Sequence, residues 1–291
     1  AGNAQTSAGG TDSTVTYDIT GPTLTLEQAA GQADPAKNTA ISFTLSANET
    51  IDATTVATGD FTATNGTVST VSGTGTSFTV TVTASGQGNV VIAPSGTFSV
   101  SDVAGNATTT AGGTDRTVTF DSVAPTLTLA QAAGQADPTN GSSIRFTLSS
   151  NEALDGTTIA ASDFTVTNGS AVTITGSGTS WTLTTTASAN GAVTITPSGT
   201  FSVSDVAGNA QVNAGGMDRT VTYDTVAPTL TLQQAIGQAD PTNGASIQFT
   251  LSANEALDGA TITASDFTVT NGSAVAVSGS GTTFTLTTTA T

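Results

Sequence analysis

Carboxylates are the side chains through which this chain could do chemistry. Its 291 residues include no histidine and no cysteine, and 21 aspartate and glutamate residues stand against 4 lysine and arginine residues. The lack of imidazole and thiol groups excludes histidine bases, cysteine nucleophiles, disulfides and the usual ligands of zinc and haem. The remaining carboxylates, amides and hydroxyls are oxygen ligands, which suit a hard cation such as calcium.

The formal net charge of −17 restricts the partners of the chain. Such a charge repels the phosphates of nucleic acids, so we exclude nucleic acid as a partner, and it favours cation binding. No run of about 18 consecutive apolar residues occurs, so we predict no membrane insertion in this segment. Abundant threonine, serine, alanine and glycine without cysteine are typical of exported bacterial proteins. We therefore expect an extracellular location, at the bacterial cell surface.

The acidic residues recur at a fixed interval of 103 residues, as from position 34 to position 137. Three sets share this interval: Asp34, Asp137 and Asp240 in the string GQADP, Asp102 and Asp205 in SDVAGN, and Asp18, Asp121 and Asp224. No insertion or deletion falls between the copies. Self-similarity at a fixed period predicts a tandem array of one structural unit.

The interval divides the chain into repeats. Residues 19–121 and 122–224 form two full repeats, and residues 225–291 form a third repeat that is incomplete at its C-terminus. Residues 1–18 correspond to the last strand of a preceding repeat. The simplest explanation of these partial repeats is that the sequence is part of a longer chain with further copies.

Within a repeat, apolar and polar residues alternate with a period of two, which indicates β-strands with one buried face. In the second repeat this alternation predicts seven strands, with inward-facing residues Leu127, Leu129, Ile144, Phe146, Leu148, Phe164, Val166, Val172, Ile174, Trp181, Leu183, Val193, Ile195, Val221 and Tyr223. Turn sequences such as PTNG, TNGS and PSGT separate the strands, and only EALDGTTIAASD could hold a helical turn. Seven short strands in about 100 residues match an immunoglobulin-like β-sandwich without its disulfide. The predicted fold class is all-β, with tandem immunoglobulin-like sandwiches in an elongated array.

The second repeat also carries a family resemblance. Its motifs are the D-x-x-AP junction, an SNE after the second strand, DFTVTNG and the closing DVAGN. These strings resemble the bacterial immunoglobulin-like repeats of large surface proteins and adhesins, and the resemblance extends over essentially the whole chain. The resemblance implies the sandwich fold and a tandem array, but it does not indicate the function of the array. The sequence departs from the family at NEALDG, where family members often have SE followed by V.

The alternating strand directions predict where the acidic loops lie. The junction at Asp121, the loop with Glu152 and Asp155 and the loop with Asp205 should meet where the chain enters the repeat, whereas Asp137 should lie at the exit end. Two converging carboxylates about 4 Å apart repel by about 4 kcal/mol at an effective dielectric constant near 20. Calcium, which takes about six to eight oxygen ligands, would neutralise this repulsion. The predicted calcium ligands at the repeat junctions are Asp18, Asp34, Glu49, Asp52, Asp102, Asp121, Asp137, Glu152, Asp155, Asp205, Asp224, Asp240, Glu255 and Asp258.

A second interpretation of these residues needs no metal. Aspartate and asparagine are favoured in turns because their side chains cap nearby backbone N–H groups, and DVAGN, ADPTNG and LDG are good turn sequences. Dedicated calcium loops of the D-x-D-x-D-G type do not occur. Both interpretations, calcium at the junctions and turns with solvated charge, stay open on the sequence.

Catalysis would need a pair of carboxylates, as in glycoside hydrolysis, and Glu152 with Asp155 is the pair to consider. The same pair recurs in register as Glu49 with Asp52 and as Glu255 with Asp258. An active site is normally built once per protein, whereas repetition indicates architecture. We therefore predict that the chain is not an enzyme.

The sequence thus predicts a mechanical function, an extender in a bacterial surface or secreted protein that holds another domain away from the cell. Neighbouring repeats of the same chain are the expected partners, with junctions stiffened by calcium. The alternative is a subunit of a self-assembling extracellular filament, sheath or surface layer, in which copies contact one another laterally. A third class, a module that binds sugars or a receptor, needs an exposed apolar patch. The 1 tryptophan, 2 tyrosines and 11 phenylalanines fall mostly on inward positions and leave little to build one.

Overall fold

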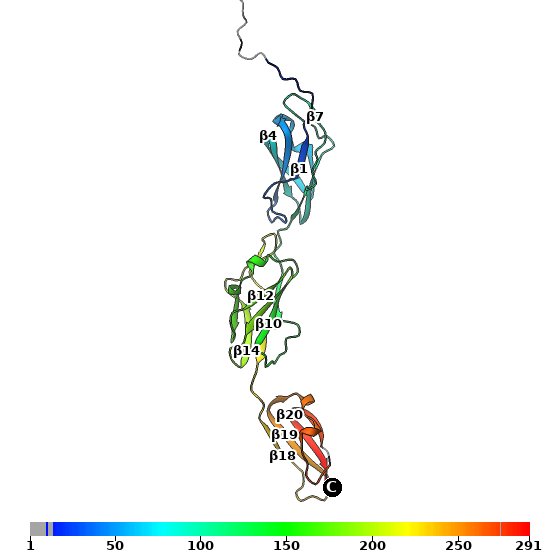
Figure 1. The fold of residues 1–291 in the computed structure, drawn as a ribbon, viewed down its shortest axis with the longest axis vertical. Coiled ribbons are helices and arrows are strands. Elements are labelled where there is room, and N and C mark those ends of the chain that lie inside the picture. Colours follow the sequence, from blue (N-terminus) through cyan, green and yellow to red (C-terminus); the bar gives the residue numbers. More distant parts are fainter. Residues whose placement is uncertain (1–9, 11–13, 274) are drawn as a thin grey trace, which may run out of the picture. The chain divides into compact units, whose positions relative to one another are not determined.

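The computed structural model describes residue 10, residues 14–273 and residues 275–291. They form β-strands joined by turns, which confirms the all-β prediction, and the helices among them are the short 3₁₀ turns η1 to η6. None of the helices in this part of the chain is long and apolar enough to cross a membrane. The described part of the chain divides into two compact units, one with the residues up to 137 and residues 141–222, the other with residues 138–140 and 223–291. The strands of each repeat can be followed by their colours in Figure 1. The domain boundaries derived from the repeat interval stay predictions.

The first repeat has two three-stranded sheets, in the orders β1-β2-β4 and β3-β5-β8, and a two-stranded ladder of β6 and β7. The strands are β1 Leu24–Gln28, β2 Ala40–Ile51, β3 Phe61–Thr64, β4 Gly66–Ala84, β5 Gly88–Pro94, β6 Val100–Ser101, β7 Ala107–Thr108 and β8 Thr117–Phe120. The long β4 occupies the place of two successive strands of the second repeat.

The second repeat has the same architecture, with sheets in the orders β12-β13-β10-β9 and β11-β14-β17. Its strands are β9 Leu127–Gln131, β10 Ser143–Ser150, β11 Phe164–Thr167, β12 Thr173–Ser177, β13 Ser180–Thr186, β14 Gly191–Pro197, β15 Val203–Ser204, β16 Ala210–Gln211 and β17 Thr220–Tyr223. If the seven longer strands are lettered A to G along the chain, the sheets read A-B-E-D and C-F-G. This is the strand arrangement of an immunoglobulin constant-type domain, here without a disulfide.

Alternate residues of both sheets form the hydrophobic core. Along β10, the side chains of Ile144, Phe146 and Leu148 are fully buried, and Phe146 lies opposite Leu183 of β13. In the other sheet, the inward side chains of β14 are fully buried as well. The core therefore lies between the two sheets, as the period of two in the sequence predicts.

The alternation predicts the burial of side chains less well at the edges of the sheets. Val166, Ile174, Trp181 and Tyr223 were expected to face inward, and they are only half-buried. Three of them lie on β11, β12 and β17, which are edge strands with a neighbour on one side only. An edge strand alternates in sequence like a central one, but solvent reaches its side chains from the open flank.

Two local features complete the second repeat. The segment expected to hold a helical turn forms the 3₁₀ turns η3 Gly156–Thr158 and η4 Ala161–Asp163, and the Asp163 carboxylate accepts a hydrogen bond of 2.7 Å from the backbone N–H of Ala160. The ladder of β15 with β16 was not expected, because two residues per strand are too few to show a period.

In the third repeat, the described residues form one sheet, in the order β18-β19-β20. Its strands are β18 Leu230–Gln234, β19 Ser246–Leu257 and β20 Ala276–Thr289. This sheet corresponds to the A-B-E-D sheet of the second repeat.

A close contact in the second repeat gives a first prediction. A Cβ atom added to Gly156 would lie 2.5 Å from the indole Cη2 of Trp181, whereas one added to Gly259 would lie 3.4 Å from Phe284. Because the indole would have to shift, we expect Gly156→Ala to destabilise the second repeat by about 1–3 kcal/mol. Urea unfolding followed by the fluorescence of Trp181, the 1 tryptophan of the chain, measures this change.

The first repeat supplies the matched control, because Ala53 and Phe78 occupy the two equivalent positions. Gly156→Ala combined with Trp181→Phe should therefore recover most of the lost stability, measured by circular dichroism. An unchanged urea midpoint for Gly156→Ala alone would contradict the steric argument.

Candidate metal centre

Three carboxylates meet at the end of the second repeat where the chain enters it. Asp121 precedes strand A, Glu152 lies in the loop between strands B and C, and Asp205 lies in the loop between strands F and G. One carboxylate oxygen from each lies within 4.8 Å of the others. We call these three residues the second acidic cluster. Asp205 is 2% exposed, and the other two side chains are half-buried.

The first repeat contains the same arrangement 103 residues earlier. Asp18, Glu49 and Asp102 also bring one carboxylate oxygen each within 4.8 Å of one another, and we call them the first acidic cluster. Asp102 is 3% exposed. The convergence of these three loops, predicted from alternating strand directions, is thus present in both repeats.

An asparagine holds the buried aspartate of the second acidic cluster. The backbone N–H of Asn209 donates to Asp205 Oδ1 at 2.8 Å, and Asn209 Nδ2 donates to Asp205 Oδ2 at 2.9 Å. The same Nδ2 donates to the backbone carbonyl of Asp121 at 2.9 Å. Asn209 therefore ties the loop between strands F and G to the segment that enters the repeat. Gly208, with φ of +88°, allows the tight turn between them.

The first acidic cluster repeats this contact. Asn106 donates to Asp102 from its backbone N–H at 2.8 Å and from Nδ2 at 2.9 Å, and Nδ2 also donates to the carbonyl of Asp18 at 3.2 Å. The hydrogen bond from the Asn106 side chain holds the pKa of Asp102 below its usual value. The charged form of Asp102 is therefore favoured.

The glutamate of each cluster behaves in the opposite way. Burial, and then the charges of Asp121 and Asp205, raise the pKa of the Glu152 carboxyl. The pKa of Glu49 is raised by the same causes in the same order, burial and then its two cluster partners. The charged form of the glutamate is disfavoured because the carboxylates around it repel it, and a bound cation would reverse that effect.

The other predicted ligands in the loop between strands B and C cap a turn. Asp155 Oδ1 accepts hydrogen bonds from Thr157 N at 2.9 Å and from Thr157 Oγ1 at 2.7 Å, which lower the pKa of Asp155. Asp52 caps η1 in the same way with a lowered pKa, and Asp258 accepts from Ala260 N at 3.0 Å. Asp155 and Asp52 do not belong to either acidic cluster. Glu152 therefore lies in an acidic cluster and Asp155 caps a turn, and the calcium-binding role of Asp155 stays a prediction.

The aspartates of the GQADP strings also make backbone contacts. Asp34 Oδ1 accepts from Thr119 N at 2.9 Å, and Asp137 Oδ1 accepts from Thr222 N at 2.8 Å. Each contact ties the loop between strands A and B to strand G. Asp240, at the same position of the third repeat, is exposed. Neither Asp34 nor Asp137 belongs to an acidic cluster.

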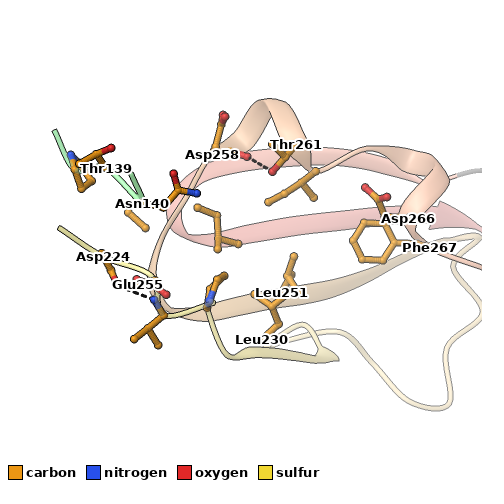
Figure 2. A pocket seen from close by; sticks show the side chains of 16 residues that line it. Thr139, Asn140, Asp224, Leu230, Leu251, Glu255, Asp258, Thr261, Asp266 and Phe267 are labelled. Carbon is orange, nitrogen blue, oxygen red and sulfur yellow. Dashed lines mark hydrogen bonds between the residues drawn. The ribbon is translucent and has the colours of Figure 1, made fainter. Parts of the chain in front are cut away.

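The remaining predicted ligands line a cavity of about 550 Å³ in the second compact unit (Figure 2). Asp224 and Glu255 are the counterparts of Asp121 and Glu152, and Asp224 Oδ1 accepts from Val226 N at 2.9 Å. The Oε1 atom of Glu255 is buried, and among the described atoms it has no hydrogen-bond partner. Asp258 lies at the rim of the same cavity in Figure 2.

The sequence predicted that Asp121, Glu152 and Asp205 lie at the end of the sandwich where the chain enters the repeat, and they do. It did not predict the hydrogen bonds that fix Asp205. The contact of Asn209 with Asp205 and with the carbonyl of Asp121 was not predicted. The signal for it is the string DVAGN, which places an asparagine four residues after the aspartate in both repeats. The capping of η1 and η3 has a similar signal, a threonine two residues after Asp52 and Asp155.

No protein-family model and no curated protein matches this chain. Among solved structures, the Escherichia coli adhesin FdeC is 15% identical, with 92% of this chain and 88% of that chain covered and a TM-score of 0.39. The Yersinia pseudotuberculosis adhesin InvE is 18% identical, with 70% of this chain and 59% of that chain covered and a TM-score of 0.26. The I9–I11 tandem of titin is 8% identical, with 91% and 90% covered and a TM-score of 0.26. Likenesses of this size carry no functional argument, and the immunoglobulin-like assignment depends on the order of the strands in the two sheets.

The raised pKa of Glu152 predicts a pH dependence. The folded state holds this proton more tightly than the unfolded chain, so the stability from Glu152 is full below its usual pKa of about 4.5 and is lost as pH rises through the raised pKa. In the presence of a chelator at pH 7, we therefore expect Glu152→Gln to raise the melting temperature of the second repeat by a few degrees. The fluorescence of Trp181 during heating at several pH values measures this.

Asp155→Ala serves as the control, because it should change the melting temperature in the opposite direction. Because its pKa is lowered, Asp155 contributes stability above its usual pKa of about 3.8 and loses it as pH falls through the lowered value. At pH 7, this variant should have a lower melting temperature than the wild type. Equal melting temperatures for Glu152→Gln and the wild type from pH 4 to pH 8 would contradict the repulsion in the second acidic cluster.

Proposed function

We propose that this chain is a structural segment of an extracellular bacterial surface protein, in which immunoglobulin-like repeats act as an extender and calcium couples each repeat to the one before it. The observation that carries this proposal is the recurrence of one acidic cluster at the same three positions of two successive repeats. A feature that recurs with the repeat serves the array, because catalysis or specific recognition normally needs a single site.

The donor set of each cluster suits calcium. Three carboxylates supply charged oxygen ligands, and nearby backbone carbonyls and water can complete the about six to eight that calcium takes. The oxygens of Asp205 each accept one hydrogen bond from Asn209, which leaves lone pairs for a cation. With 4 basic residues against 21 acidic ones, the chain has few side chains that could neutralise these carboxylates.

The position of Asp121 supports a role in coupling repeats. Strand β8 of the first repeat ends at Phe120, and the backbone N–H of Asp121 donates to the carbonyl of Ala36 in that repeat at 2.8 Å. The backbone carbonyl of Asp121 accepts from Asn209 of the second repeat. A cation bound by its carboxylate would restrict the connection between one repeat and the next.

Calcium should therefore stabilise the second repeat. At a calcium concentration 100-fold above the dissociation constant, binding contributes about 2.7 kcal/mol, and dissociation constants of about 10⁻⁴ to 10⁻³ M are typical of extracellular modules. The gain should be lost in Glu152→Gln and kept in Glu49→Gln, because Trp181 reports on the second repeat. Urea unfolding with calcium or with chelator measures both variants. Equal gains in the two variants would contradict binding at the second acidic cluster.

The extender role has its own test. Small-angle scattering of the full chain should give a larger maximum dimension in calcium than in chelator, while circular dichroism in chelator still shows folded sandwiches. Asp121→Asn with Glu152→Gln should abolish the part of this response that comes from the connection between the first and second repeats, and it should leave the first acidic cluster intact. A maximum dimension that does not respond to calcium would contradict the coupling of repeats.

A further inference from the structure

One lysine side chain connects the first repeat to the second. Lys37, the one lysine of the chain, lies in the loop between strands A and B of the first repeat, and its Nζ donates to the backbone carbonyl of Gly208 at 3.0 Å. Gly208 lies 171 residues later, in the loop between strands F and G of the second repeat. The end of the lysine side chain also covers this glycine, because a Cβ atom added to Gly208 would lie 3.5 Å from Nζ and 3.8 Å from Cδ of Lys37. The contact therefore joins loops of two successive sandwiches.

Lys37 extends from a part of the first repeat that is held by several hydrogen bonds. The residue before it, Ala36, is 3% exposed, and its backbone N–H donates to the carbonyl of Thr119 at 2.8 Å. The carbonyl of Ala36 accepts from the backbone N–H of Asp121 at 2.8 Å, where the chain leaves the first repeat. The Asp34 carboxylate accepts from Thr119 N at 2.9 Å. The backbone of Lys37 is therefore fixed beside the connection to the second repeat.

The carbonyl that accepts from Lys37 belongs to the peptide group that holds the buried aspartate of the second acidic cluster. This peptide group joins Gly208 to Asn209, and its N–H donates to Asp205 Oδ1 at 2.8 Å. The N–H of Gly208 donates to the backbone carbonyl of Asp205 at 3.2 Å. A hydrogen bond accepted by the carbonyl of a peptide polarises that peptide and strengthens the bond that its N–H donates. The lysine of one repeat is thus linked through a single peptide group to a carboxylate of the next.

The loop that carries Lys37 has a different sequence in the other repeats. Residues 33–38 read ADPAKN, whereas residues 136–141 and 239–244 both read ADPTNG, so asparagine takes the place of lysine there. The asparagine side chain is shorter and carries no charge. Residues of the Lys37 loop and Ala207 of the second repeat line a cavity of about 320 Å³. The sequence difference therefore lies where the first two repeats meet.

We propose that the turn Asp205–Asn209 is a docking site for the Lys37 ammonium, and that this contact orders the connection between the two repeats without a bound cation. The ammonium is a compact charged donor on a flexible stem, and a backbone carbonyl is a matching acceptor. Because the ammonium binds a neutral carbonyl, it leaves the carboxylate oxygens of the cluster free for a cation. The proposal therefore does not depend on the calcium proposal. A single contact still permits rotation about it, which a cation at Asp121 would restrict further.

Distances between spin labels on the two repeats test this proposal. Thr62 of β3 and Thr165 of β11 are exposed and occupy equivalent positions, and the chain has no cysteine, so Thr62→Cys with Thr165→Cys can be labelled selectively. In chelator, we expect a defined distance distribution in the otherwise wild-type chain and a broader one in Lys37→Asn, which introduces the residue of the other two repeats. Lys37→Arg keeps a charged donor and should preserve most of the order. Equally broad distributions with and without Lys37→Asn would overturn the proposal, and they would leave the calcium proposal standing because a cation at Asp121 acts without Lys37.

Hydrogen exchange separates docking from a general effect of charge. In chelator, Lys37→Asn should speed the exchange of the Asn209 amide by about two- to tenfold, the range expected for the loss of one hydrogen bond. Arg145→Gln removes a positive charge from the exposed face of β10, and it should change neither the exchange of Asn209 nor the label distances. An unchanged exchange rate of Asn209 in Lys37→Asn would overturn the proposal, and so would an equal effect of Arg145→Gln.

Discussion

The pleat of the two sheets is the constraint on which the rest of the structure depends. Successive side chains of a strand point to opposite faces, so a strand that builds the core can place a carboxylate only on its outer face or at its end. The core residues of β10 and β14 are fully buried, and the acidic residues of the second repeat lie outside its strands. Because strands A, C and G begin at one end of the sandwich, the segments before them meet there. The acidic clusters arise from this geometry.

Within each cluster, the three carboxylates are stabilised to different degrees. Asp205 and Asp102 are buried and each receives two hydrogen bonds from an asparagine. Glu152 and Glu49 have a raised pKa because burial and neighbouring charges disfavour their charged form. In each cluster, the hydrogen-bonded aspartate is held in place, whereas the charged form of the glutamate is disfavoured by the carboxylates around it. A divalent cation bound there would remove that conflict, because it would turn the repulsion among three carboxylates into shared coordination.

Much of this arrangement could be predicted from the sequence. The period of 103 residues and the alternation of apolar residues indicated the repeats, the strands and most of the core, and alternating strand directions indicated that Asp121, Glu152 and Asp205 converge. The roles of Asp155 and Asp137 could not be predicted, because a turn-capping aspartate and a ligand have the same sequence signal. Their hydrogen bonds with Thr157 and Thr222 depend on short-range backbone geometry that alternation does not encode. The half-buried Ile174 and Val166 depend on sheet order, which follows from pairing between distant strands.

Calcium titration of the full chain by calorimetry tests the central claim most directly. The account predicts saturable binding that Glu49→Gln and Glu152→Gln each reduce by one site, with both substitutions together removing both sites of the two described clusters. Asp155→Ala, which removes a turn cap outside the clusters, should leave the number of sites unchanged. Binding that persists in the double variant, or no saturable binding to the wild type at millimolar calcium, would contradict the account.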